Sequence, residues 1–553
     1  MAASLVTRST PADLLRPLGV VLAALLGLAA CDAGFGGEVA GNAPPETELA
    51  VRSSDLRDDL DGRRLVSTVE VAWSGTDPDG VVQAYEVRSY QVDAAPGPEQ
   101  GWSRTTRRDS TLRLAIPLGA STADVAVEVR AVDDEGAVDP SPARTVFPII
   151  NSNPSLKLIA AEAPPDSTWP VISFSLSADD LDGEDNLAGV EIALNNPEGP
   201  YVRLPADVTF VTVVAETPEA ATSAVTLYTG RGFRNTALSL PGLRLDADNA
   251  VYFRSVDQAG AASPVVRYPA LDIDGQPTAT LYVRRVTSRV LLVNDVRVGD
   301  PAQPLGVARA ALAAHGTGGY DEWDLSATPQ AASSPRFSDA LPTTADPTLR
   351  QTLPLWDRVY WVSNAVTNTA AGNNLPRAAS VMDLFFEQGG RILVQVPVTL
   401  PQGTDAGASN AAIDILPLST LIEFPPGVRA LRADAGTPVR PQAQVPGTGR
   451  TLPPLQAARL ITSALPYTTG PDDIPLYAMS FYENNTPDNP WQGSETLASI
   501  RSDLRSALFA LPIFAGPTLL FEPTTPGGDG VVDALAVLLD GLGFPGSARL
   551  ARR

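Results

Sequence analysis

Short segments in which apolar and polar residues alternate fill the chain from about residue 44 to residue 146. Two of them are Ser67–Trp73 (STVEVAW) and Val125–Arg130 (VAVEVR), and Asp, Gly and Pro residues separate such segments. Alternation with a period of two indicates strands with one buried face, and turns require Asp, Gly and Pro. The pattern predicts an all-β sandwich domain over residues 49–150.

A second copy of the pattern follows directly. The segment 130–137 (RAVDDEGA) matches the segment 254–261 (RSVDQAGA), and the turn 77–80 (DPDG) matches the turn 180–183 (DLDG). The two landmarks lie about twenty residues farther apart in the second copy. This internal repeat predicts a second β-sandwich over residues 151–286, with an added segment between the landmarks.

The pattern changes at residue 289. Continuous apolar runs now alternate with stretches of helical periodicity, in this order: strand 290–293, helix 305–315, strands 320–325 and 357–363, helix 378–388 and strand 391–396. This order predicts an α/β domain with a doubly wound parallel sheet over residues 287–548. Residues 401–475 are rich in Pro, Gly, Thr and Ala, which favours a long insertion or lid.

Two family resemblances follow from these segments. Residues 44–275 resemble bacterial fibronectin type III or immunoglobulin-like modules, through the Trp73 strand before DPDG and through VRAVDDEGAVDPSPA at 129–143. The segments VLLVND, YDEWDL, WDRVYWVSN and LFFEQGGRILVQVP resemble the class I glutamine amidotransferase-like, flavodoxin-like superfamily over residues 288–400, extended by 507–542. The first resemblance implies modules that bind, space or present, and the second implies a flavodoxin-like fold.

The N-terminus has the features of a lipoprotein signal peptide. Arg8 and Arg16 precede an uncharged run at 18–30 (LGVVLAALLGLAA), which is too short to span a bilayer comfortably. The run ends in LAAC, which looks like a lipobox, so we expect cleavage after residue 30, lipid on Cys31 and a flexible tether over residues 31–48. Several acyl chains on Cys31 give a stable membrane anchor. The alternatives are an ordinary signal peptide with a chance cysteine and a buried thiol.

Net charge and residue counts argue against two classes of function, nucleic-acid binding and zinc binding by His and Cys. The formal charge is -23, and Lys157 is the only lysine among 553 residues. Such an acidic surface repels phosphate backbones, so we expect no nucleic-acid partner. Two explanations of the acidity remain open. One is genome composition together with a soluble or salt-adapted surface, and the other is a specific cationic partner. One His and one Cys cannot supply the three ligands of a zinc site.

The same counts bear on catalysis. Catalytic members of the amidotransferase-like superfamily use a cysteine nucleophile with a histidine and an acid. Here the only cysteine is Cys31, outside the α/β domain, and no GxSxG motif offers a serine instead. His315 ends an expected helix before Gly316, where imidazole and glycine suit a helix terminus. The resemblance therefore implies a domain without catalysis.

Polar residues follow the expected parallel strands. Ligands bind at the carboxyl ends of strands in open α/β sheets, which makes Asn294, Asp295, Ser363 and Asn364 a candidate ligand site. The same residues are equally suited to capping helices and turns. Asp295 acting with Asp321 or Glu322 would instead give an envelope hydrolase working through carboxylates.

Asp-x-Asp-Gly turns raise the question of calcium. Asp77 with Asp79 and Asp180 with Asp182 are the weak candidates, because paired carboxylates beside a glycine can bind Ca²⁺. The alternative is an ordinary turn, since Asp and Gly are turn residues and no twelve-residue calcium loop accompanies them.

These observations lead to one expected function. The chain is an acidic lipoprotein of the cell envelope, held to a membrane through Cys31, periplasmic or surface-exposed. Its β-modules present a non-catalytic α/β domain that binds a protein, peptide or glycan, and it needs no resident metal or cofactor. The carboxylate hydrolase is the alternative, followed by a purely structural spacer.

Overall fold

The computed structural model describes residues 41–57, 64–232, 234–296, 302–326, 341–342, 344–363, 374–398, 411–515, 518–528 and 530–546. The expected signal peptide, Cys31 and Asn364 lie outside these ranges. The chain divides into two compact units, one of residues up to 115 together with 122–149, and one of residues 116–121 together with 150 and beyond. Within the described ranges, no helix is long and apolar enough to cross a membrane.

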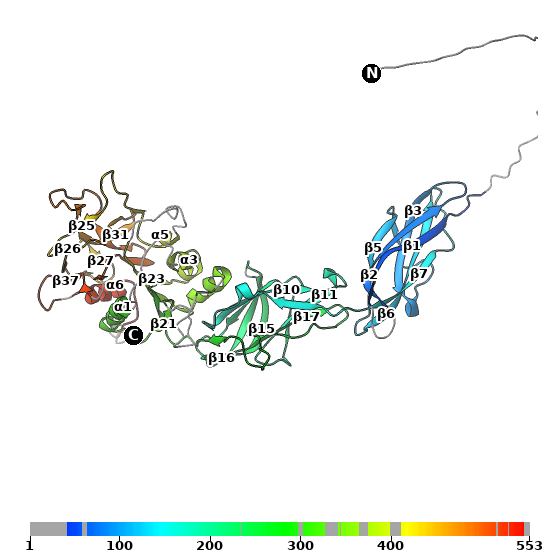
Figure 1. Ribbon diagram of the computed structural model, residues 1–553, viewed down its shortest axis with the longest axis horizontal. Helices are drawn as coiled ribbons and strands as arrows, with labels where there is room; N and C mark the ends of the chain where they lie inside the picture. Colours follow the sequence, from blue (N-terminus) through cyan, green and yellow to red (C-terminus); the bar gives the residue numbers. More distant parts are fainter. Residues whose placement is uncertain are drawn as a thin grey trace, which may run out of the picture. The chain divides into compact units, whose positions relative to one another are not determined.

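Strands alone make up the core of the first unit (Figure 1). They are β1 (Glu46–Arg57), β2 (Arg64–Thr76), β3 (Val82–Gln91), β4 (Ser103–Thr105), β5 (Asp109–Arg113), β6 (Thr122–Asp133) and β7 (Ala143–Ile150). The neighbours run β5-β2-β1 and β7-β6-β3-β4, with a single residue pair joining β2 to β7. Every second residue of β2, such as Val69 and Val71, is buried, whereas β6 is buried without a break from Val125 to Val129. The predicted β-sandwich is confirmed.

The first module begins earlier than the expected tether allows. β1 starts at Glu46, and the Asn42 side chain already donates to Asp133 Oδ2 at 2.7 Å. The backbone N–H of Ala43 donates to Asp79 Oδ2 at 2.9 Å. Residues 42–48, which the sequence assigned to the tether, are therefore part of the first module, because polar contacts outside the alternating pattern hold them.

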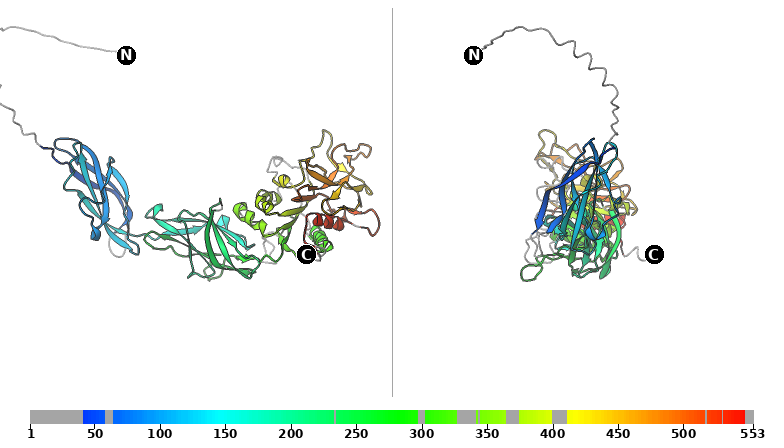
Figure 2. Two further views of the ribbon diagram at one scale, coloured as in Figure 1. Left: turned by 180° about the vertical axis from the view of Figure 1, so that it is seen from behind. Right: turned by 90° about the vertical axis from the view of Figure 1, so that its right-hand side faces the viewer.

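The second β-module has two main sheets, β15-β14-β13-β10-β8 and β12-β11-β17-β18, and a small one, β16-β19-β9 (Figures 1 and 2). Its strands are β8 (Ser155–Leu158), β9 (Ser167–Thr168), β10 (Val171–Asp179), β11 (Leu187–Leu194), β12 (Val202–Leu204), β13 (Phe210–Ala215), β14 (Thr222–Thr229), β15 (Arg234–Arg244), β16 (Ala247–Asp248), β17 (Val251–Asp257), β18 (Val266–Tyr268) and β19 (Tyr282–Val283). The antiparallel hairpin β14–β15 has no counterpart in the first module. It supplies the extra residues that the repeat predicted.

The repeat extends to side-chain contacts. On β6 and β17, Arg130 and Arg254 occupy matching positions, and each guanidinium lies over an aromatic ring, Trp102 at 4.3 Å and Tyr201 at 4.2 Å respectively. Asn42 bonds Asp133 in the first module as Asn151 bonds Asp257 in the second. Contacts kept between two diverged copies indicate one shared framework.

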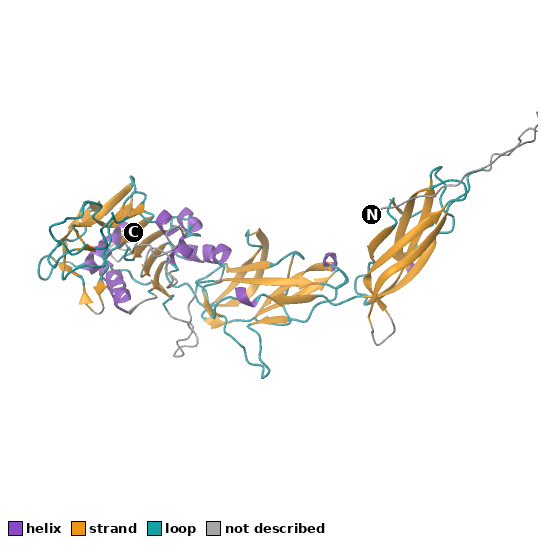
Figure 3. Cartoon of the chain, turned by 45° about the horizontal axis from the view of Figure 1, so that its top comes forward, coloured by secondary structure: helices purple, strands orange, loops and turns teal. Residues whose placement is uncertain are grey.

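A parallel sheet forms half of the C-terminal domain. Its strands run in the order β21 (Asp321–Asp324), β20 (Val290–Asp295), β22 (Arg358–Ser363), β23 (Arg391–Gln395), β34 (Ser506–Phe509). α1 (Ala302–His315) and α6 (Val531–Gly541) pack with Val290 and Leu292 on one face. η4 (Ala345–Leu349), α2 (Arg350–Thr352), η5 (Leu353–Leu355), α3 (Leu375–Ala379), α4 (Asp383–Glu387) and α5 (Ala411–Ile415) supply the other face, against Leu291 and Val293. Figure 3 shows most helices gathered in this domain.

The other half of the sheet differs from the expected doubly wound pattern. After β34 the strands pair antiparallel, in the order β33 (Thr496–Arg501), β31 (Asp473–Met479), β26 (Pro438–Pro441), β29 (Leu455–Ala457), β37 (Phe521–Pro523). In the described part of the expected insertion or lid at 401–475, Val439 and Leu455 are fully buried in the core, so these residues belong to the body of the domain. Smaller strands complete this half: β24 (Thr420–Leu421), β25 (Leu431–Arg432), β27 (Gln444–Val445), β28 (Arg450–Thr451), β30 (Tyr467–Thr468), β32 (Tyr482–Glu483), β35 (Phe514–Ala515) and β36 (Thr518–Leu519).

One tryptophan joins the second β-module to the C-terminal domain. Trp169, between β9 and β10, is 1% exposed and belongs to the hydrophobic cluster on one face of the parallel sheet. Its ring makes edge contacts with Trp356 and Trp323, at centroid distances of 4.7 and 6.3 Å. The Arg284 guanidinium carbon lies over the Trp169 ring, 4.1 Å from its centroid. The two domains therefore share one core and fall into one compact unit.

Candidate functional site at the carboxyl edge of the parallel sheet

The carboxyl ends of β20 and β22 meet where the chain order of the sheet reverses. β21 lies on one side of β20 and β22 on the other, so loops from these strands leave in opposite directions. In open α/β sheets such a switch point forms the crevice in which ligands bind. Asp295 ends β20 and Ser363 ends β22, and these two expected site residues therefore lie at the switch point.

Asp295 is the centre of the hydrogen bonds at this edge. Its side chain is 0% exposed, and it accepts the backbone N–H of Asn374 at 3.0 Å and the Asn374 side-chain amide at 2.7 Å. The Trp361 indole and the Ser363 hydroxyl each donate to Asp295 Oδ2 at 3.3 Å. Asn374 precedes α3, so Asp295 fixes the start of that helix from a neighbouring strand.

Asn294 points to the other side of the switch point. Its amide donates to Asp324 Oδ1, at the end of β21, at 3.0 Å and to Ser326 Oγ, two residues farther on, at 3.1 Å. Tyr360 likewise donates to Gln395 on the next strand. The described residues of the expected site, Asn294, Asp295 and Ser363, do gather at one edge, but they are buried and hydrogen-bonded, as the capping interpretation predicts.

The environment of Asp295 changes its proton affinity. Burial raises the pKa of the Asp295 carboxyl to about 6, against the lowering effect of the donors from Asn374, Trp361 and Ser363. Burial also raises the pKa of the nearby Tyr360 phenol, which stays neutral. Asp295 is thus a carboxyl group that exchanges its proton within one or two units of neutral pH.

We expect Asp295→Asn to remove part of the pH dependence of stability. Because the folded-state pKa lies above the unfolded value, the wild-type protein loses stability as pH rises from about 4 to about 6, by about 3 kcal/mol in total. Denaturant unfolding at several pH values should therefore show that the free energy of unfolding of the wild type falls relative to that of the variant as pH rises across this window. Asp185→Asn, at an exposed site, is the control. Parallel stability curves for Asp295→Asn and wild type would contradict the assignment.

Asp321 and Glu322 are not brought to this edge. Asp321 pairs with Leu291, four residues before Asp295 along β20, which corresponds to about 13 Å. Its carboxylate accepts the Trp356 indole N–H at 2.8 Å and the backbone N–H groups of Thr287 and Ser288, so it joins the strand to the preceding linker. Glu322 pairs with Arg309 on α1. The expected pairing of Asp295 with Asp321 or Glu322 is wrong.

The sole histidine also lies at the opposite edge. α1 starts after the carboxyl end of β20 and returns to the amino edge, where His315 precedes Asp321 by six residues. His315 Nδ1 lies 3.0 Å from Thr317 Oγ1, within the turn that follows the helix. The imidazole therefore cannot act on Asp295, and its position agrees with the helix-end interpretation.

The calcium candidates serve as turn acceptors. Asp77 Oδ1 accepts the N–H of Asp79 at 3.4 Å, and Asp180 Oδ1 accepts the N–H of Asp182 at 2.9 Å. Asp182 Oδ2 accepts the N–H of Ser152 at 2.6 Å. Among the described residues, no group of three or more His, Cys, Asp or Glu side chains is placed to hold a metal ion.

A ligand that binds only the folded state must raise the melting temperature. Because the Asp carboxylates serve the turns, we expect the melting temperature to be the same with excess Ca²⁺ as with a chelator. Differential scanning calorimetry of the mature protein measures this directly. A rise with Ca²⁺ that Asp180→Asn abolishes would restore the calcium hypothesis.

Several site residues escaped the sequence analysis. Asn374 comes 79 positions after Asp295 in the chain, in a stretch without helical or strand periodicity. Asp324 and Ser326 gave a usable signal, since they follow Trp323 at the end of an apolar strand as Asn294 follows Val293. Trp361 appeared only as a strand residue, and its indole donor role depends on the pairing of β22 with β20.

Comparisons with known proteins add little to this description. No family model matches the chain, and no curated protein matches it significantly. Similar solved structures include the fibronectin(III)-like modules of Clostridium thermocellum CbhA (12% identity, 42% of this chain and 94% of that chain, TM-score 0.16). Others are the FN1-FN3 domains of chicken CNTN1 (12% identity, 45% and 69%, TM-score 0.16) and the chitinase ChiA74 from Bacillus thuringiensis (13% identity, 40% and 28%, TM-score 0.13). At these TM-scores, the β-sandwich architecture rests on the strand pairing alone.

Proposed function

We propose that this chain is an envelope-anchored lipoprotein, periplasmic or surface-exposed, whose β-modules present the C-terminal domain to a protein, peptide or glycan partner. The anchor rests on Cys31, the only cysteine of the chain, directly behind the apolar run 18–30. An anchor at Cys31 leaves the C-terminal domain without a thiol nucleophile. Recognition without covalent chemistry is therefore the function that we assign to the switch point.

The order of the parallel strands bears on the family of the C-terminal domain. With β20 counted first, the parallel strands have the order 2-1-3-4-5, which is the flavodoxin-like order. That order supports the resemblance to the class I glutamine amidotransferase-like superfamily for the parallel half of the sheet. The antiparallel strands beyond β34 are additional to it. The repeated Arg-aromatic and Asn-Asp contacts of the two β-modules support a shared fibronectin III-like or immunoglobulin-like origin.

The single observation that carries the recognition function is the saturation of Asp295. Four hydrogen bonds reach its carboxylate from Asn374, Trp361 and Ser363, so no oxygen is directed at a substrate. A residue held in this way positions its surroundings. It fixes the start of α3 relative to β20 and β22, and thereby holds the edge of the sheet in one arrangement for a partner.

An envelope hydrolase is the second candidate. The pKa of Asp295, raised by burial to about 6, is the observation that favours it, because a general acid or base works best near the ambient pH. The distance of Asp321 and Glu322 from this edge removes both carboxylates that were expected to act with Asp295. Asp324 does lie at this edge, but its carboxylate accepts hydrogen bonds from Asn294 and Ser326.

Cross-linking in native membranes tests the proposal. The full-length protein should capture a specific envelope component, and Asn374→Ala, which removes an Asp295 donor, should reduce capture at least tenfold. Asn489→Ala, which removes an exposed amide far along the chain, is the control variant. A second control is the first β-module alone, residues 32–149, because this module forms its own compact unit. The protein can also be assayed on a panel of esters, glycosides and peptides. If it hydrolyses one of them and Asp295→Asn does not, the hydrolase is the correct function. Equal capture by the first module alone would also contradict the proposal.

A further inference from the structure

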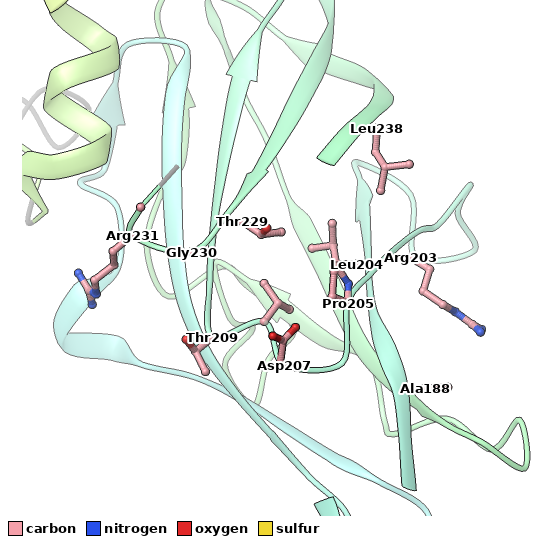
Figure 4. Close-up of a pocket in the computed structure, with 12 residues that line it drawn as sticks. Ala188, Arg203, Leu204, Pro205, Asp207, Thr209, Thr229, Gly230, Arg231 and Leu238 are labelled. Atoms are coloured by element: carbon pink, nitrogen blue, oxygen red, sulfur yellow. The ribbon is translucent and has the colours of Figure 1, made fainter. Parts of the chain in front are cut away.

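The second β-module contains a cavity that neither the anchor nor the switch point uses. It has a volume of about 780 Å³, within the range of small-molecule sites, and opens where the edge strand β12 faces the loop before β13 and the hairpin β14–β15. Figure 4 shows the residues that line it. Leu204 and Val208, 1% and 5% exposed, form an apolar floor together with Leu238.

Asp207, unlike the other charged groups that line this cavity, forms no ion pair with any described residue. Two arginines also line it, but Arg203 pairs with Glu191 at 2.9 Å and Arg231 pairs with Glu162. Figure 4 shows both guanidinium groups turned away from the space above the Asp207 carboxylate. The cavity therefore presents one negative charge, the exposed carboxylate of Asp207.

Two hydroxyl groups accompany that carboxylate. Thr209 and Thr229 line the same cavity, and Thr229 is 9% exposed, with its side chain facing the interior of the cavity (Figure 4). A carboxylate and two hydroxyls can accept hydrogen bonds, and an ammonium group donates three. The apolar floor beneath them suits the methylene groups of an alkyl chain, as when a lysine stem lies on an apolar surface.

We propose that this cavity binds a primary alkylammonium group, carried by a lysine side chain of a partner protein or by a free aliphatic amine. The ammonium group contacts Asp207 and the threonine hydroxyls, and the alkyl chain lies on Leu204 and Val208. The overall charge of -23 draws cations toward the protein, and Lys157 is the only lysine of the chain itself. This site is independent of the function proposed for the switch point, because it lies in the β-module.

Calorimetric titration of the chain without the expected lipid anchor, residues 32–553, tests this site. Nα-acetyl-lysine amide should bind with a Kd near the millimolar range, whereas its Nε-acetyl form, which has no charge, should bind at least tenfold more weakly. Asp207→Asn should weaken binding of the lysine compound at least tenfold, and Thr229→Val should weaken it less. Asp185→Asn, an equal loss of charge at an exposed position of the same module, should leave binding unchanged.

A pentylamine titration distinguishes the two sources, since a free amine needs no flanking peptide while a partner lysine gains from one. Melting temperatures of all variants check that the module stays folded. Equal binding of the acetylated compound, unchanged binding in Asp207→Asn with an intact fold, or no saturable binding at about 20 mM would each overturn the proposal.

Discussion

Trp169→Ala is expected to lower the free energy of unfolding of the second compact unit by about 3–5 kcal/mol. The side chain is 1% exposed and fills the space between Trp356, Trp323 and Arg284, so its removal leaves a cavity in a core shared by two domains. This core couples the second β-module to the C-terminal domain, so we expect the wild-type compact unit to melt in one transition. In Trp169→Ala, the two domains should melt in separate transitions. Denaturant unfolding and differential scanning calorimetry measure the two effects.

Trp169→Phe is the matched variant. The Trp169 indole N–H has no hydrogen-bond partner, so a phenyl ring loses ring volume without breaking a polar contact. We expect it to cost clearly less than the alanine variant and to keep one transition. Trp102→Ala, in the first unit, should leave the melting of the second unit unchanged. A loss below about 1 kcal/mol in Trp169→Ala would show that the two domains are not coupled through this residue.

Cys31→Ser is expected to move the protein from the membrane fraction to the soluble fraction completely. A serine hydroxyl does not take the thioether-linked lipid, and the protein then keeps none of the acyl chains that hold it to the bilayer. Metabolic labelling with a radioactive or clickable fatty acid should disappear at the same time. Asp32→Ala, a change at the next residue, should keep both the label and the membrane association.

The sequence predicted those parts of the fold in which one pattern continues over many residues. Alternation around Val69 and Val127 predicted the first sandwich, and the match of 130–137 to 254–261 predicted the second, with its extra residues now seen as β14–β15. The continuous apolar run at 290–293 predicted a strand buried on both faces.

Short strands and isolated contacts could not be predicted. β26 and β29 have four and three residues and lie near prolines, so no alternation marks them, and only their pairing with distant strands reveals them. Trp169 stands between Thr168 and Pro170 without periodic neighbours. Its partner Trp356 is far away in the chain, and no local pattern connects the two.

The candidate site was predicted in position but not in detail. Asn294, Asp295 and Ser363 lie at one edge, because residues that follow parallel strands share that edge. Asp321 was misplaced, since the sequence does not show which end of the segment YDEWDL faces the site. The register of β21 with β20 puts Asp324 beside Asn294 and Asp321 at the other end.

Mass spectrometry of the N-terminal tryptic peptide, from protein purified out of membranes, tests the central claim most directly. The account predicts a peptide that begins at Cys31 and ends at Arg52, with the mass of a diacylglyceryl group and any further acyl chain on Cys31. An unmodified Cys31, or a mature N-terminus at another residue, would contradict the lipid anchor and the function built on it.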